Sequence, residues 1–149
     1  MGVFGRISRI IKSNINALLD AAEDPEKSLN QIITDMQSNF REAKEQVAQS
    51  MVDERKLERK LEKSKAEVRK WTEKAQLAVR KGNDDLAKQA LLRAKSNKSL
   101  SEELDKQVDQ QRRAVENLKF ALSTLEKKIE EAKAKRHVLV ARKRTVEAT

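Results

Sequence analysis

Residues 29–47 read LNQIITDMQSNFREAKEQV. Apolar side chains that would lie on one face of a helix recur in this stretch at alternating steps of four and three residues. The spacing continues to residue 78, through the positions Leu29, Ile33, Met36, Phe40, Ala43, Val47, Ser50, Glu54, Leu57, Leu61, Ser64, Val68, Trp71, Ala75 and Ala78. Strict apolar–polar alternation, the mark of a half-buried strand, is absent. A three-four spacing sustained over many turns is typical of a coiled-coil helix.

Local signals predict where this helix begins and ends. Asp24 is the expected N-cap, and Pro25 occupies the first helical position, where its missing N–H costs nothing. The helix is therefore predicted over 25–80. Gly82 favours the left-handed conformation past a helix end, and Asn83 or Asp84 is placed to cap a second helix.

The short tip, 81–85, requires the second helix, 86–149, to fold back antiparallel on the first. Its expected seam is Leu86, Ala90, Arg93, Asn97, Leu100, Leu104, Val108, Gln111, Val115, Leu118, Leu122, Leu125, Ile129, Ala132, Arg136, Leu139, Lys143 and Val146. The two steps of four around Leu104 predict a local stutter that relaxes supercoiling. Arg93 and Asn97 are expected either to pair with Glu67 or Ser64 across the hairpin, or to specify its register as buried polar groups. The second helix lacks a stop signal, so we expect a truncated chain.

Residues 3–20, within an N-terminal segment of 1–24, form a wide apolar stripe when they are placed on a helical wheel. The predicted membrane-binding residues, apolar and basic together, are Val3, Phe4, Arg6, Ile7, Arg9, Ile10, Ile11, Lys12, Ile15, Leu18 and Leu19. An apolar face opposite cations, with no acid before Asp20, favours a helix lying in an anionic membrane interface. Two alternatives stay open: packing of this helix on the hairpin or on a neighbouring subunit, and an organelle transit peptide. A secretory signal is disfavoured, because Arg9 and Lys12 interrupt any apolar h-region.

Composition restricts the function further. The formal charge is +9, charged residues make up 38% and aromatic residues 3%, and there is no cysteine. This balance favours anionic partners. Among anionic partners, nucleic acid is disfavoured for two reasons. A basic run such as 133–144 is more often a solvated helix face, and the motifs of the chain match no DNA-binding module. We expect no catalytic residues, no cofactor and no metal site, because His137 stands alone and no phosphate loop or nucleophile–base set is present.

Three motifs carry a resemblance to a known family. The chain opens with MGVFGRI, continues with NINALLDAAEDPEK over 14–27, and has WTEKA at 71–75 and DDLAKQAL at 84–91 on the two sides of the tip. The sequence resembles the phage shock protein A family, which includes the vesicle-inducing protein of plastids, over all of its 149 residues. Trp71 within this pattern is expected to be a packed core aromatic or a partner contact.

The resemblance implies an all-α peripheral membrane protein of the bacterial branch of the endosomal sorting complex membrane-remodelling superfamily. It implies location on the cytoplasmic side of the inner membrane, or on the thylakoid membrane, and self-assembly into rods or rings that remodel or protect the bilayer. An alternative function is implied by some members, namely inhibition of an AAA-type transcription activator in an envelope stress response. Family members continue with further helices past the point where this chain ends.

Overall fold

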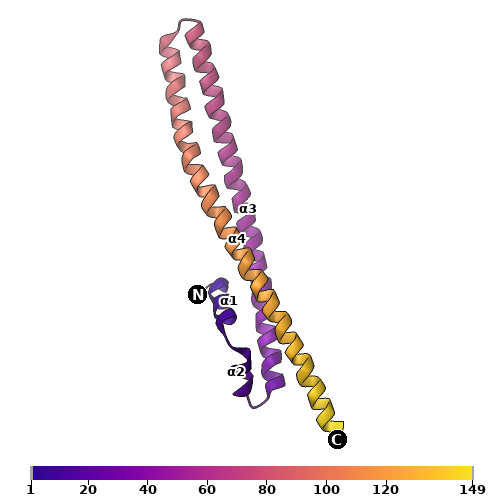
Figure 1. Cartoon of the computed structure of the whole chain (residues 1–149). Coiled ribbons are helices and arrows are strands. Elements are labelled where there is room, and N and C mark those ends of the chain that lie inside the picture. The colour runs from indigo at the N-terminus through magenta and orange to yellow at the C-terminus, as the bar shows by residue number, and fades with distance from the viewer. Residues whose placement is uncertain (1, 149) are drawn as a thin grey trace. The chain divides into compact units, whose positions relative to one another are not determined.

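A computed structural model describes residues 2–148, which form four helices (Figure 1). These are α1 (Val3–Lys12), α2 (Ile15–Asp20), α3 (Pro25–Arg80) and α4 (Asp84–Ala148). No strand occurs among the described residues, and α3 packs antiparallel against α4 as a helical hairpin, so the all-α prediction is confirmed. The chain divides into two compact units, Met1–Ala48 with Glu116–Thr149, and Gln49–Val115.

The start of α3 follows the predicted capping chemistry. Asp24 accepts a hydrogen bond from the backbone N–H of Lys27 at 3.2 Å, and its carbonyl accepts one from the N–H of Ser28 at 3.0 Å. Pro25 is the first helical residue. These bonds satisfy N–H groups that the first turn of a helix leaves without intrahelical partners.

The turn between the long helices is closed by backbone and side-chain bonds. Gly82 has φ +75°, and the N–H groups of Gly82 and Asn83 donate to the carbonyls of Val79 and Ala78 at 3.0 and 2.9 Å. This is the Schellman arrangement that ends a helix in a left-handed residue. Asn83 then accepts from the N–H of Leu86 at 3.2 Å, so α4 begins at Asp84, two residues earlier than predicted.

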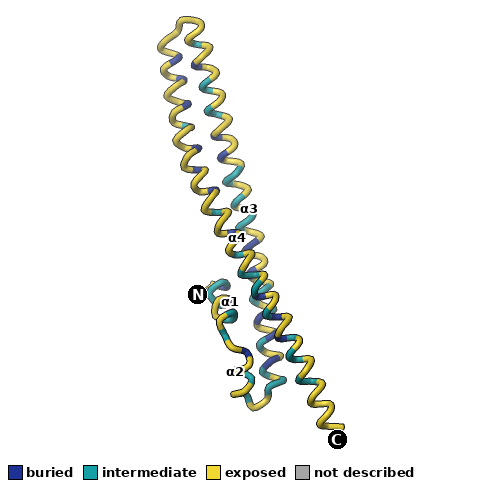
Figure 2. The backbone as a smooth tube through the Cα atoms, viewed as in Figure 1, coloured by how far each residue is buried: buried dark blue, intermediate teal, exposed yellow. Residues whose placement is uncertain are grey.

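Near the tip, the expected seam of α4 is confirmed at Ala90, Leu104 and Val108 and is wrong at three other positions. Leu86, Arg93 and Leu100 are exposed, and the buried positions of this part of the helix are Ala87, Ala90, Ala94, Ser101, Leu104 and Val108. With half-buried Asn97 between Ala94 and Ser101, the steps of three and four alternate without interruption, so the predicted stutter does not occur. Small side chains occupy the seam on α3 as well, at Ala75 and Ser64. Dark-blue buried positions follow the facing sides of α3 and α4 in Figure 2.

The polar groups of this seam find partners. Ser64 donates to the carbonyl of Asn97, and Ser101 donates to the hydroxyl of Ser64, both at 2.9 Å. The predicted link between Ser64 and Asn97 therefore exists, through a backbone carbonyl. Glu67 accepts from the indole N–H of Trp71 at 3.1 Å, while the Arg93 guanidinium lies 4.6 Å from the centre of that ring.

Candidate membrane-binding segment

The N-terminal segment is two short helices, whereas a single helix over 3–20 was expected. The backbone of Ser13 and Asn14 is extended. Ser13 bonds back to the carbonyl of Ile10 through its hydroxyl at 2.6 Å, and Asn14 accepts from the N–H of Ala17 at 3.2 Å as the cap of α2. Serine and asparagine compete for backbone hydrogen bonds in this way, which favours helix ends over helix interiors.

The apolar face of this segment packs on the hairpin. Val3 and Ile7 are 1% and 0% exposed, and Ile15 is buried too. They join a single core cluster whose other buried members are Leu29, Ile33, Met36, Ala43, Leu125, Ile129 and Ala132. Phe4, Ile10, Ile11 and Leu19 are partly buried against the same cluster, while Leu18 is 51% exposed. The structure thus has the arrangement that the sequence left open as an alternative to lipid insertion.

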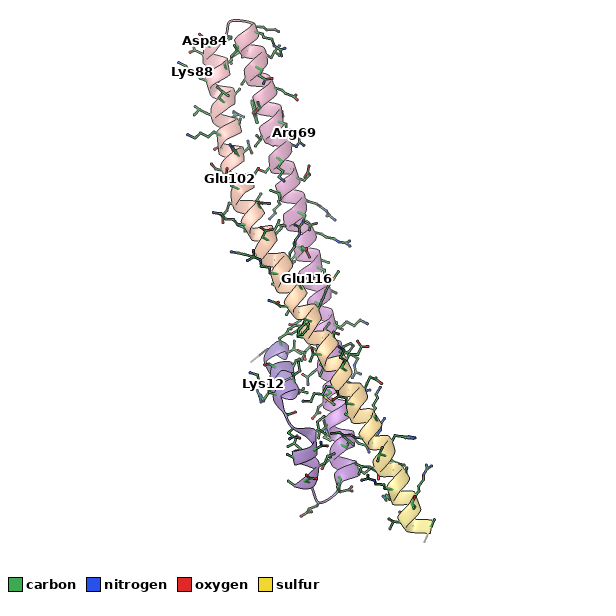
Figure 3. The ribbon with its side chains drawn as sticks, viewed as in Figure 1. Lys12, Arg69, Asp84, Lys88, Glu102 and Glu116 are labelled. Atoms are coloured by element: carbon green, nitrogen blue, oxygen red, sulfur yellow. The ribbon has the colours of Figure 1, made fainter. Side chains whose placement is uncertain are left out.

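The basic side chains of α1 have two different surroundings. Arg6 is half-buried and bonds to α3, donating to Asn39 at 2.9 Å and to Glu42 at 2.5 Å. Arg9 and Lys12 are exposed. Figure 3 shows Lys12 on the side of α1 that faces away from the long helices. Arg9 and Lys12 therefore lie on an exposed face of α1, while its apolar face is covered.

The most specific polar contact comes from α4. The ammonium group of Lys128 donates to the carbonyls of Ile11 and Ser13, at 2.8 and 2.7 Å. The last carbonyls of a helix lack intrahelical partners and carry the negative end of the helix dipole, so a cation there stabilises the end of α1. Burial lowers the pKa of Lys128 below its ordinary value of 10.5, with Glu131 opposing this shift and Lys135 adding to it.

Further contacts join α2 to α4. Lys135 donates to the side-chain amide oxygen of Asn16. A groove between the two helices is lined by Leu19, Lys135, Val138 and Arg142 among others. The residues Lys128, Lys135, Asn39 and Glu42 were missed from the sequence, because they lie on the hairpin and look like ordinary solvated positions of a charged coiled coil.

Neither a spanning helix nor a metal cluster occurs in the described part of the chain. Within residues 2–148, no helix is long and apolar enough to cross a bilayer. The same residues contain no group of three or more histidine, cysteine, aspartate or glutamate side chains arranged to hold a metal ion.

Comparison with known proteins supports the resemblance read from the motifs. The model of the PspA/IM30 family matches residues 2–149. The chain belongs to the PspA/IM30 family. The recognition made from the opening residues and the tip is therefore confirmed.

Curated relatives share this region at moderate identity. A "Membrane-associated protein Vipp1" of Nostoc punctiforme is 43% identical over 99% of this chain and 57% of its own length. A "Phage shock protein A homolog" of Deinococcus radiodurans is 38% identical over 99% of this chain and 66% of the relative. For the chloroplastic "Membrane-associated protein VIPP1" of Arabidopsis thaliana, identity is 41% over 97% of this chain and 44% of the relative. The chain thus spans roughly half to two thirds of the length of these relatives.

Proposed function

We propose that this PspA/IM30 family member is a non-enzymatic, peripheral membrane protein that binds anionic phospholipid through the apolar face of α1 and α2, on the inner membrane or the thylakoid membrane. The observation that carries the proposal is the segregation of side chains on α1: Val3 and Ile7 lie on one side, and Arg9 and Lys12 are exposed on the other. That division matches the two layers of a membrane interface. The names of the relatives from Nostoc and Arabidopsis are consistent with it.

Packing on the hairpin and insertion into lipid use the same side chains, so the two states exclude each other. Each large apolar residue gains about 1.5–3 kcal/mol when fully buried, whichever apolar medium buries it. The balance between the states is therefore set by smaller terms. The polar contacts of Arg6, Lys128 and Lys135 favour the packed state, and attraction of about 1 kcal/mol per basic residue near an anionic leaflet favours the bound state.

The joints on both sides of α2 allow the segment to leave the hairpin while α3 and α4 stay intact. Ser13 and Asn14 interrupt the helix on one side, and residues 21–24 lie between α2 and α3 on the other. The independent cap at Asp24 keeps the start of α3 closed without any contribution from α1.

We further propose that copies of the chain assemble and bend or shield the bilayer, as rods or rings of hairpins. Two grooves flank the hairpin within residues 49–115. Val79 and Leu91 contribute apolar side chains to one, and Leu77 and Leu86 to the other, whose lining is partly basic. All four side chains are about half exposed or more. Exposed apolar patches of this kind mark association surfaces, and two grooves per copy permit side-by-side stacking. One weakly inserted helix per copy then gives firm binding through avidity.

Co-sedimentation with vesicles tests the proposal. The intact chain is expected to pellet with vesicles of phosphatidylglycerol, more weakly with phosphatidylcholine alone, and a chain lacking residues 1–24 is expected to stay in solution. Equal pelleting of both chains would refute binding through this segment. The regulatory alternative, inhibition of an AAA-type activator, predicts instead that the shortened chain still captures that activator.

A further inference from the structure

Through Lys128, α4 bonds directly to the backbone of the N-terminal segment. The ammonium reaches past its own helix to two carbonyls, of Ile11 and Ser13, that bracket the end of α1. Both carbonyls lie where the chain leaves the helical path. A single side chain thus fixes the position of the joint between α1 and α2.

The neighbouring positions of α4 show that this role is specific. Lys127, next in the sequence and with the same charge, is exposed, while Lys128 is half-buried between helices. Leu125, Ile129 and Ala132 of the same helix belong to the core cluster that covers Val3 and Ile7. Lys128 therefore stands at the edge of the apolar contact that any lipid-bound state has to open.

We propose that Lys128, through its bonds to the carbonyls of Ile11 and Ser13, holds α1 against the hairpin and thereby limits membrane binding. We call this contact the latch. This inference rests on the proposed function, because it assigns the control of the same apolar face. Opening the latch transfers the ammonium from two carbonyls to water or to a lipid phosphate. A phosphate is the stronger acceptor, since both partners of that bond are ionised. Anionic headgroups thus favour release in addition to attracting Arg9 and Lys12.

The latch predicts that removing the charge of Lys128 changes the affinity for an anionic membrane in the direction opposite to the usual one. Loss of a positive charge ordinarily weakens binding to an anionic membrane, yet loss of Lys128 is expected to strengthen it, because a larger fraction of the chain then has α1 free. Lys128→Met keeps the aliphatic stem and removes the donors. Lys127→Met changes the charge and the hydrophobicity equally and leaves the latch in place, so it is the matched control.

Two measurements on the full chain test the inference. The first uses Val3→Cys as a thiol reporter, since the chain has no other cysteine and Val3 is 1% exposed. In solution, without lipid, the thiol is expected to react with a maleimide several-fold faster when Lys128→Met is added than when Lys127→Met is added. The second measures binding to phosphatidylglycerol and phosphatidylcholine vesicles, where Lys128→Met is expected to raise the affinity at least about fivefold over Lys127→Met.

The outcomes separate the latch from the proposed function. Equal labelling rates in the two backgrounds would overturn the latch, whatever the vesicles show. Faster labelling without a gain in vesicle affinity would overturn the control of membrane binding by Lys128. If the chain lacking residues 1–24 then also bound vesicles as well as the intact chain, the proposed function itself would fail. Circular dichroism of Lys128→Met checks that the long helices remain.

Discussion

At the scale of single residues, the contribution of buried polar groups to the stability of the hairpin can be tested at Ser64 and Ser101. Their hydroxyls are buried and bonded to one another across the hairpin at 2.9 Å. Ser101→Ala is expected to lower the free energy of unfolding by about 0.5–1.5 kcal/mol, the usual net contribution of one hydrogen bond. Ser99→Ala, at an exposed position of the same helix, makes the same change in helix propensity and serves as the control. Chemical denaturation measures both, and equal midpoints would contradict the role of the pair.

At Gly82 the constraint is the backbone conformation, and side-chain packing plays no part. Its φ of +75° lies in the left-handed region, and a Cβ added there meets no atom within 4 Å. Gly82→Ala is therefore expected to destabilise the hairpin by about 1 kcal/mol, entirely through backbone strain. Gly82→Asn is expected to recover part of that loss, because asparagine tolerates this conformation. A larger loss with Asn than with Ala, measured by thermal unfolding, would contradict the explanation.

At the scale of the helix, some features follow from local chemistry, such as the positions of helix ends, and others do not, such as which residues form the seam. The ends of α3 and the tip were predictable, because Asp24, Pro25 and Gly82 each act on their own backbone neighbours. The break at Ser13 and Asn14 carried the same kind of signal, since both are capping residue types, but the continuous apolar stripe concealed it. The seam near the tip was predicted one residue too early at Leu86, Arg93 and Leu100, where the buried residues are the small Ala87, Ala94 and Ser101.

The covering of the α1 stripe was not predictable from the sequence. An amphipathic pattern specifies that one face avoids water, and lipid or a hairpin groove satisfies it equally. Only the three-dimensional positions of Leu29, Leu125 and Ile129 show what covers Val3 and Ile7 in this state. For the same reason Lys128 had no recognisable signal, since its bonds are to backbone carbonyls more than a hundred residues away.

The two faces of α1 are expected to respond differently to the same charge change. Phe4→Asp removes a half-buried aromatic side chain, and Ser8→Asp adds the same negative charge at an exposed position. Phe4→Asp is expected to weaken vesicle binding about tenfold or more, because an aspartate loses its hydration in the acyl region of the bound state, whereas residue 4 stays partly exposed to water in the packed state. Ser8→Asp is expected to cause a smaller loss that disappears at high salt, because screening removes a purely electrostatic effect. Vesicle titrations at two salt concentrations distinguish them, and equal losses would argue against insertion of the apolar face.

At the scale of the whole molecule, the grooves near the tip allow a test of the proposed assembly and of its proposed link to membrane binding. Val79→Ser with Leu91→Ser removes two apolar side chains from one groove. This pair is expected to raise the concentration needed for self-association roughly tenfold, as followed by sedimentation velocity. Val52→Ser, at an exposed apolar position outside the grooves described above, is the control. An equal shift in the control would assign the effect to general hydrophobicity.

The same groove variant separates the contribution of α1 from that of avidity. Its N-terminal segment is unchanged, so each copy is expected to keep the intrinsic affinity for phosphatidylglycerol vesicles that is proposed above. Linked sites bind more tightly than single ones by roughly 10²–10⁴, and this gain requires an assembled protein. Val79→Ser with Leu91→Ser is therefore expected to bind with a shallower curve and a lower apparent affinity, and fusion to a short dimeric coiled coil is expected to restore part of the loss. Binding identical to that of the unmodified chain would mean that single copies carry the full affinity, and assembly would then act on membrane shape alone.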